Sequence, residues 1–191
     1  MNVYDFDKTI YDGDSTADFY MFSLKRHKMI LTLLPSLAAA FLNFYVFHRG
    51  TKTIFKQKMY RFLTFCDTER DVEDFWKENK AKIKKYYLEQ QKPDDIIISA
   101  SPEFLLKPIC REIKINHLIA SVVDPKTGKY SGENCHGEEK VRRLYSEFPN
   151  AKIDEFYSDS HSDDPLAKIA LKAFMVNKND LSPWQFKNVP D

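Results

Sequence analysis

Cysteine and glycine are scarce in this sequence of 191 residues, and acidic residues are missing from one long stretch of it. The three cysteines are an odd number and form no C-x-x-C pair, which favours a reduced, cytoplasmic setting over a disulfide framework. The first nine residues, MNVYDFDKT, lack the basic start, apolar stretch and cleavage site of a secretory signal peptide. We therefore expect a cytoplasmic protein.

The stretch without acids is residues 19–66, which contain no Asp or Glu. The cations in this stretch are Lys25, Arg26, Lys28, Arg49, Lys52, Lys56, Lys58 and Arg61. The rest of the chain has 21 Lys and Arg against 28 Asp and Glu, a net charge of −7, so the overall charge of +1 hides a basic segment in an acidic protein. A total charge near zero gives no indication of nucleic-acid binding, and we expect none.

The pattern of apolar residues predicts an α/β protein. With 43% hydrophobic and 30% charged residues, the chain can form a sizeable core and is not typical of disorder. After residue 91, apolar runs of strand length alternate with amphipathic helical patterns. We expect strands at residues 2–6, 95–99, 118–123, 153–158 and 173–176, a hairpin return at 129–135, and helices from 103, at 138–148 and at 165–171.

Residues 15–91 separate the first strand from the others and look helical, with a single glycine, Gly50. The alternation of strands and helices implies a doubly wound, mainly parallel sheet. The sequence thus predicts a core of residues 1–14 and 92–191, with residues 15–91 inserted as an α-helical cap. The tripeptide Ser101-Pro102-Glu103 is typical of a helix start, with Ser101 as N-cap and Pro102 at the first helical position.

Two carboxylates at the end of the first expected strand are the first candidates for chemistry. Asp5 and Asp7 flank one residue in YDFDKT, and side chains two apart in a strand share a face. Taken alone, this pair is more typical of a surface loop. Its position changes that interpretation, because open α/β sheets bind ligands at the carboxyl ends of their strands.

Other polar residues follow the later strands or begin the neighbouring helices. Ser99 ends one apolar run, Lys140 lies in the first turn of an expected helix, and Asp159 and Asp163 follow the strand at 153–158. One cation and several carboxylates at one sheet edge would be costly to bury unless a metal ion or an anion were bound there.

These segments together resemble the four motifs of the haloacid dehalogenase (HAD) superfamily. DFDKT resembles motif I, IIISAS motif II, the lysine of GEEKVRRL motif III, and the acid pair of YSDSHSDDPL motif IV. Their order and spacing match, and the resemblance spans nearly the whole chain. It is nearest to the branch that contains phosphoserine phosphatase, whose helical cap lies between motifs I and II, where residues 15–91 stand.

The resemblance implies a role for each motif carboxylate. Asp5 would be the nucleophile that attacks phosphorus and would also bind Mg²⁺, with Asp159 and the backbone carbonyl of Asp7 as further ligands. The Asp7 side chain would protonate the leaving alcohol and then activate water against the aspartyl-phosphate.

The resemblance also implies a phosphate-binding set. Ser99 and the backbone amides after it would hold the phosphoryl oxygens, and Lys140 would neutralise charge on the nucleophile and the phosphoryl group. Asp163 would act from the second layer around the metal, orienting Lys140 or a metal-bound water.

The sequence departs from the motifs at two positions. Lys8 stands where motif I usually has glycine, which we expect to be tolerated if residue 8 keeps a negative φ. Ser162 replaces the usual asparagine of motif IV. His161 is interpreted as a loop side chain rather than a metal ligand. Cys135-His136 has no matching metal-binding pair in the sequence, and we assign it no metal.

Residues 29–47 contain no charge and are long enough to cross a membrane. A single crossing would separate Asp5 from Ser99, and Pro35 leaves two pieces that are too short for two crossings. Two interpretations therefore stay open, a buried cap helix and a cationic, apolar surface that rests on an anionic membrane.

The main hypothesis is therefore a Mg²⁺-dependent phosphatase for a small phosphorylated substrate. The alternative is a peripheral enzyme that acts on a phospholipid headgroup, similar to phosphatidylglycerophosphate phosphatases. A phosphomutase and a catalytically inactive binding module are weaker hypotheses. The sequence indicates neither the substrate nor the oligomeric state.

Overall fold

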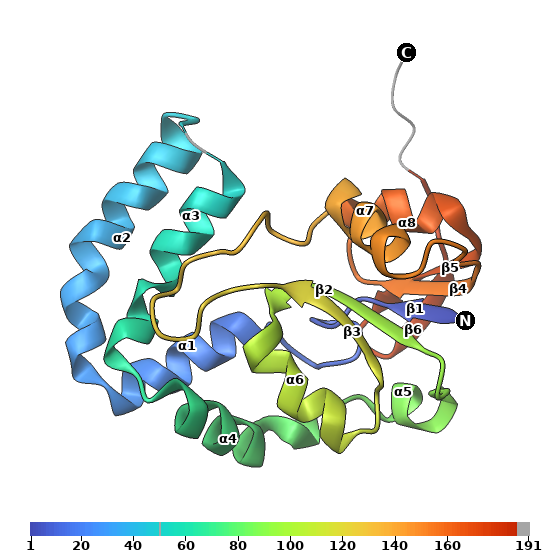
Figure 1. Ribbon diagram of the computed structural model, residues 1–191, viewed down its shortest axis with the longest axis horizontal. Helices are drawn as coiled ribbons and strands as arrows, with labels where there is room; N and C mark the ends of the chain where they lie inside the picture. The colour runs from blue at the N-terminus through green and yellow to red at the C-terminus, as the bar shows by residue number, and fades with distance from the viewer. Residues whose placement is uncertain (50, 187–191) are drawn as a thin grey trace.

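The computed structural model describes residues 1–49 and 51–186, so Gly50 lies outside the described residues. One six-stranded sheet runs through the molecule in the order β3-β2-β1-β4-β5-β6 (Figure 1). The strands are β1 Asn2–Tyr4, β2 Ile96–Pro102, β3 His117–Ser121, β4 Ile153–Ser158, β5 Ala170–Asn177 and β6 Asp180–Pro183. The first five are parallel and β6 is antiparallel to β5, so the predicted α/β fold with a mainly parallel sheet is confirmed.

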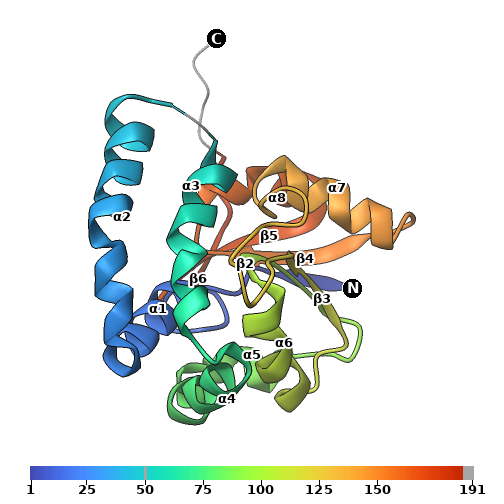
Figure 2. The same ribbon diagram turned by 60° about the vertical axis from the view of Figure 1, so that its left-hand side comes forward.

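Helices cover both faces of this sheet (Figures 1 and 2). The α-helices are α1 Ser15–Arg26, α2 Leu34–Phe41, α3 Lys52–Met59, α4 Thr68–Asn79, α5 Lys85–Gln90, α6 Glu103–Glu112, α7 Glu138–Glu147 and α8 Asp164–Ile169. Short 3₁₀ or π turns connect or extend them at η1 Lys28–Leu33, η2 Leu42–Val46, η3 Tyr60–Phe65, η4 Lys80–Lys82 and η5 His161–Asp163. Residues 15–91 are therefore mostly helical, as predicted.

The period of two along each strand divides the core into two layers. On one face, Tyr4 and Tyr157 stack with ring centroids 4.6 Å apart and pack towards α4, α5 and α6. On the other face, Val3 and Phe156 pack with Leu144 of α7. Because both faces of β1 are covered, all three of its residues are buried.

The division into a core and a cap at residues 15 and 91 stays a prediction, and the packing refines it. Tyr87 of α5 meets Tyr4 with centroids 4.9 Å apart, and Trp76 of α4 meets Phe6 at 6.1 Å. Both α4 and α5 thus lie on the sheet layer. By contrast, α2 and α3 project from the sheet as a helical hairpin (Figures 1 and 2).

Several element boundaries differ from the prediction. Strand β2 continues through Pro102, so α6 begins at Glu103 without a side-chain cap, and the assignment of Ser101 as its N-cap was wrong. The hairpin expected at residues 129–135 is reduced to an isolated antiparallel bridge between Val123 and Tyr130. Strand β6 was not predicted, because residues 180–183 follow a turn and are exposed, with no apolar alternation to reveal them.

Candidate active site

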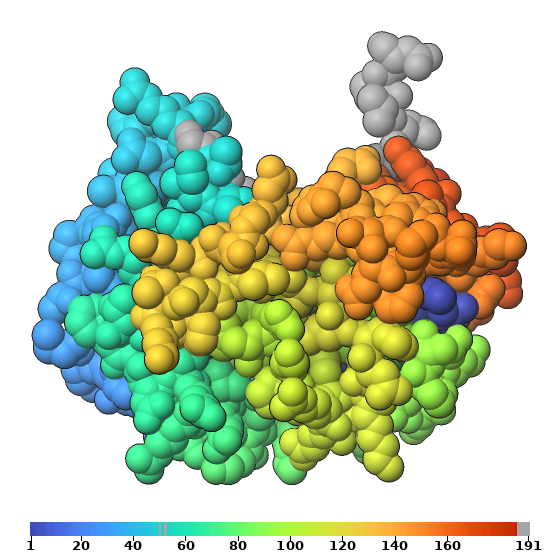
Figure 3. Space-filling model, in the orientation of Figure 1, coloured from blue at the N-terminus to red at the C-terminus, as the bar shows by residue number. Residues whose placement is uncertain are grey.

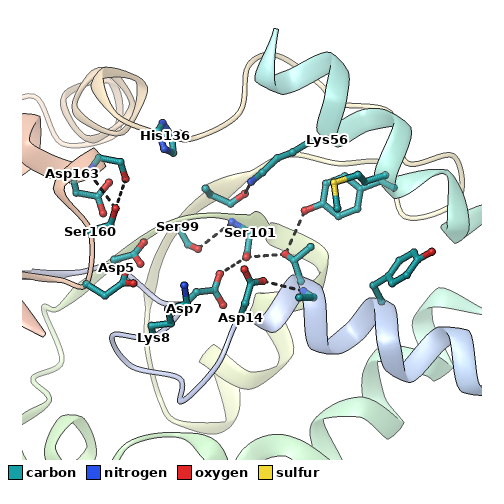
Figure 4. Close-up of a pocket in the computed structure, with 18 of the residues that line it drawn as sticks. Asp5, Asp7, Lys8, Asp14, Lys56, Ser99, Ser101, His136, Ser160 and Asp163 are labelled. Atoms are coloured by element: carbon teal, nitrogen blue, oxygen red, sulfur yellow. Dashed lines mark hydrogen bonds between the residues drawn. The ribbon is translucent and has the colours of Figure 1, made fainter. Parts of the chain in front are cut away.

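The end of β1 positions the first carboxylate. The backbone N–H of Asp5 donates to the carbonyl of Tyr157 at 2.9 Å, which extends the β1–β4 pairing one residue beyond the strand. In the strand order seen here, β1 lies between β2 and β4, at the point where the connections change direction. Ligands of open α/β sheets bind at this point. The Asp5 side chain faces that edge of the sheet (Figure 4).

Lys140 is the buried link between two of the predicted site residues. Its Nζ donates to Asp5 Oδ1 at 2.7 Å and to Asp163 Oδ2 at 2.8 Å, and the residue is 2% exposed. Ser158, at the end of β4, donates its hydroxyl to the same Asp163 oxygen at 2.7 Å. Burial lowers the pKa of Lys140, but Asp5 and Asp163 outweigh that effect and raise it. The ammonium is thus fixed as a cation against Asp5.

Carboxyl groups nevertheless outnumber lysines in the site, and burial disfavours their charged forms. Burial raises the pKa of Asp5 and of Asp7, and it also raises that of Asp159, whose carboxyl lines the same cavity. Asp163 Oδ1 is buried and has no hydrogen-bond partner among the described residues. An excess of buried carboxylate oxygens with no soft donor among them fits a hard divalent cation such as Mg²⁺.

Asp7 is held by residues of α1 and β2. Its Oδ1 accepts the backbone N–H of Ser15 at 2.7 Å, and its Oδ2 accepts the hydroxyl of Ser101. That hydroxyl also lies 2.9 Å from Thr16 Oγ1. These bonds stabilise the carboxylate, but desolvation is the larger effect and the pKa of Asp7 is raised. A raised pKa suits a group that must donate a proton near neutral pH.

Two serines of β2 lie beside these carboxylates. Ser99 is 1% exposed, and its Oγ accepts the backbone N–H of Ser101 at 3.1 Å (Figure 4). The register between β2 and β3 shifts between Ser99 and Pro102, which turns this segment towards the cavity. Ser99 was predicted from the sequence as a site residue, whereas Ser101 was predicted only as a helix cap. The available signal was the i, i+2 spacing, which places both serines on one face of a strand.

A cavity of about 580 Å³ lies between this sheet edge and the cap. The predicted residues that line it are Asp5, Asp7, Ser99, Lys140, Asp159 and Asp163. The hollow between the α2–α3 hairpin and α7 is visible on the surface (Figure 3). The opposite wall is largely apolar, with Tyr20 and Met21 from α1 and Met59 from α3. The structure thus brings all six predicted residues to one cavity.

A cap lysine also reaches this cavity. Lys56 of α3 donates its Nζ to the carbonyl of Ala100 at 3.3 Å and to Asn134 Oδ1 at 3.1 Å (Figure 4). Ala100 lies between the two serines of β2, so the bond ties the cap to the segment expected to hold phosphate. Lys56 is one of the cap cations in the sequence, but nothing local in a helix indicates a contact 44 residues away.

Lys8 contradicts the conformational expectation. Its φ is +57°, in the left-handed region that favours glycine. Two hydrogen bonds hold this conformation. The N–H of Lys8 donates to the carbonyl of Gly13 at 2.8 Å, and Lys84 Nζ donates to the carbonyl of Lys8. The condition under which we expected Lys8 to be tolerated, a negative φ, is therefore not met. The Lys8 side chain lines the cavity.

The remaining polar candidates have other contacts. His161 Nδ1 lies 3.2 Å from Asp164 Oδ1, and its ring packs against Trp184. Ser162 pairs with Ser160 at 3.0 Å. Cys135 is buried in the core, whereas its neighbour His136 lines the cavity. These two side chains thus occupy different environments.

One protein-family model matches most of the chain. The model of haloacid dehalogenase-like hydrolases matches residues 3–168, which cover β1 to α8 and every candidate site residue. The chain belongs to this family of hydrolases.

Solved structures share the fold. A Bordetella pertussis protein of unknown function superposes with a TM-score of 0.70 at 18% identity, over 91% of this chain and 87% of that one. A phosphoserine phosphohydrolase-like protein from Francisella tularensis gives 0.56 at 12% identity, over 91% and 86%. At these identities the likeness concerns the fold alone.

Curated relatives match over a shorter segment. A Mycobacterium tuberculosis protein named probable phosphatase Rv3661 is 33% identical over 91 residues, which is 44% of this chain and 32% of the relative. An uncharacterized protein from another strain of that species matches equally well. The chain thus matches about a third of the length of these relatives.

Proposed function

We propose that this protein is a Mg²⁺-dependent phosphomonoester hydrolase that forms an aspartyl-phosphate on Asp5. The observation that carries the proposal is the buried bridge from Asp5 through Lys140 to Asp163, with Asp7 lining the same cavity. It supplies a nucleophile, a fixed cation and a candidate acid at one sheet edge.

In the first step, a carboxylate oxygen of Asp5 attacks phosphorus and the bond from phosphorus to the ester oxygen breaks. Asp7 donates its proton to that leaving oxygen. In the second step, Asp7 takes a proton from water as the water attacks phosphorus, which releases phosphate and restores Asp5. Ser99 and Lys140 stabilise charge on the phosphoryl oxygens in both steps.

The metal would be held by Asp5, Asp159 and the backbone carbonyl of Asp7. When bound, Mg²⁺ supplies positive charge against the phosphoryl oxygens. Asp163 acts on the site through Lys140. The predicted cytoplasmic location is part of this proposal.

Metal removal should abolish hydrolysis. Because the three lysines that line the cavity cannot neutralise its five carboxyl groups and a phosphate dianion together, we expect treatment with EDTA to reduce phosphate release to background and added Mg²⁺ to restore it. The measurement is initial rate on p-nitrophenyl phosphate before chelation, after it, and after Mg²⁺ is added back. Full activity after exhaustive chelation would refute the metal requirement.

The same assay separates this function from its alternatives. A hydrolase releases inorganic phosphate from p-nitrophenyl phosphate, whereas a binding module releases none. A phosphomutase returns the phosphoryl group to the substrate, so a phosphorylated sugar would change isomer without stoichiometric phosphate release. Phosphate release in step with nitrophenol formation supports the proposal.

A lipid phosphate is the second candidate substrate, and one observation favours it. Met21 and Met59 line the cavity and are also exposed, at 51% and 38%, so the apolar wall of the cavity continues to the surface. Such a rim suits an acyl or alkyl chain attached to the phosphate. A panel of soluble and lipid phosphomonoesters, compared by kcat/KM, distinguishes the two candidates.

A further inference from the structure

The apolar segment of the cap lies at the surface. Residues Lys28–Val46 are long and apolar enough to cross a membrane, but only 17% of their most apolar window is buried. The buried cap helix considered from the sequence is therefore not what forms. The large apolar side chains exposed here, named the cap face from this point, are Met29, Leu31, Leu34, Phe41, Leu42, Tyr45, Val46 and Phe47.

The fold is incompatible with a single crossing by this segment. Strand β1 precedes it and β2 follows it, and the two strands pair directly, with Val3 opposite Ile96. After the segment, α3 returns along α2, and Phe44 and Phe55 stack with centroids 5.1 Å apart. A helix that spanned a bilayer would place β1 and β2 on opposite sides. Contact in the plane of the interface is the remaining membrane mode.

Charge at the edges of the cap face is positive. Lys25 and Lys28 are exposed at one end and Arg49 at the other, and no acid occurs between residues 19 and 66. Arg26 is different, because it pairs with Asp71 at 3.3 Å and with Asp74 at 2.9 Å. An apolar strip with cations at both ends matches an anionic bilayer, where headgroups attract the cations and acyl chains accept the apolar side chains.

We propose that the cap face docks on the surface of an anionic lipid bilayer. In this mode the protein does not cross the membrane, and the rim of the cavity at Met21 and Met59, on the same cap, stays close to the lipid. Docking does not rest on the proposed hydrolase activity, because it uses no residue of the catalytic site. The two claims can therefore fail separately.

The test is co-sedimentation of the full chain with phosphatidylglycerol vesicles and with phosphatidylcholine vesicles. We expect binding to the anionic vesicles at low salt and at least tenfold weaker binding to the neutral ones. Raising the ionic strength past the physiological value, where the Debye length is about 8 Å, should weaken binding further. Hydrolysis of p-nitrophenyl phosphate, measured on the same samples, reports separately on the catalytic site.

Charge variants test the electrostatic part. The Lys25→Glu/Lys28→Glu variant should bind anionic vesicles at least tenfold more weakly than the wild type, since each basic residue near an anionic membrane surface adds to the free energy of binding. Arg26 is left unchanged because it is already paired with Asp71 and Asp74 of α4. The matched control, Lys152→Glu/Lys168→Glu, changes the charge equally at exposed positions of the core and should bind like the wild type.

Substitution of exposed leucines by glutamine tests the apolar contact between the cap face and the acyl chains. Leu31→Gln/Leu34→Gln/Leu42→Gln removes three leucines that are 46–49% exposed, and it should reduce vesicle binding at least tenfold without changing the thermal midpoint. The control changes three exposed leucines elsewhere, Leu88, Leu171 and Leu181, to Gln and should bind normally.

Three outcomes would overturn the proposal. One is wild-type protein that stays in the supernatant with both vesicle types at low salt. A second is equal loss of binding in the cap-face and control variants. The third is self-association in sedimentation velocity that the cap-face variants abolish, in the absence of vesicle binding; the face would then be an interface with a second copy of the chain.

Discussion

Asp5→Asn should reduce phosphatase turnover to background. The substitution keeps the shape of the side chain and removes the charge that attacks phosphorus in the proposed mechanism. We expect a loss of at least about a thousandfold in kcat, measured as phosphate release from p-nitrophenyl phosphate, because removal of a covalent nucleophile has effects of this size or larger.

The matched control for this variant is Asp12→Asn. Asp12 lies seven residues further along the same loop region, is exposed, and does not line the cavity. It should retain wild-type turnover. Both proteins should show cooperative thermal unfolding, which separates loss of chemistry from loss of fold. If Asp5→Asn keeps even a tenth of wild-type turnover, Asp5 is not the nucleophile.

Asp7→Asn should have the second largest effect, and its size should depend on the leaving group. Proton donation by a positioned side chain contributes about 10²–10⁴-fold. An alkoxide needs that proton and nitrophenolate hardly does, so we expect kcat on an alkyl phosphate to fall by about 10³-fold or more.

On p-nitrophenyl phosphate the same variant should behave differently. The first step should proceed, whereas hydrolysis of the aspartyl-phosphate, which needs Asp7 as a base, should slow. Rapid-mixing experiments should then show a burst of nitrophenol, stoichiometric with enzyme, followed by slow turnover. Equal losses on both substrates without a burst would contradict the role of Asp7 in both steps.

The fold and the candidate site could be predicted because their signals are local. Apolar runs of strand length identified β2 and β4, and the polar residues that follow or end them were already assigned to one sheet edge. Parallel strands place their carboxyl ends together, so Asp5, Ser99 and Asp159 could be grouped without knowledge of side-chain contacts.

What could not be predicted depends on contacts between distant segments. The composition around Ser101 is typical of a helix cap, and although its spacing from Ser99 places both serines on one face of a strand, its contact with Asp7 joins residues 94 apart in the sequence. The positive φ of Lys8 results from hydrogen bonds with Gly13 and Lys84, not from its own preference. Lys56 reaches Ala100 only after the α2–α3 hairpin has folded over the sheet edge.

The exposure of the cap face also depends on contacts between distant segments. An apolar segment of this length has one composition whether it is buried in a bundle or exposed on a surface. Its burial depends on whether enough other elements cover it. Here α3 packs on one side through Phe44 and Phe55, and the other side is open.

The central claim is that the reaction passes through an aspartyl-phosphate on Asp5, and trapping that species tests it most directly. The Asp7→Asn protein would be mixed with p-nitrophenyl phosphate and Mg²⁺, quenched in acid during the burst, and reduced with borohydride, which converts an acyl phosphate of aspartate to homoserine. Peptide mass spectrometry would then locate the modified residue. The account predicts homoserine at position 5 in substrate-treated protein only. Turnover with no modification, or with the modification at another carboxylate, would contradict it.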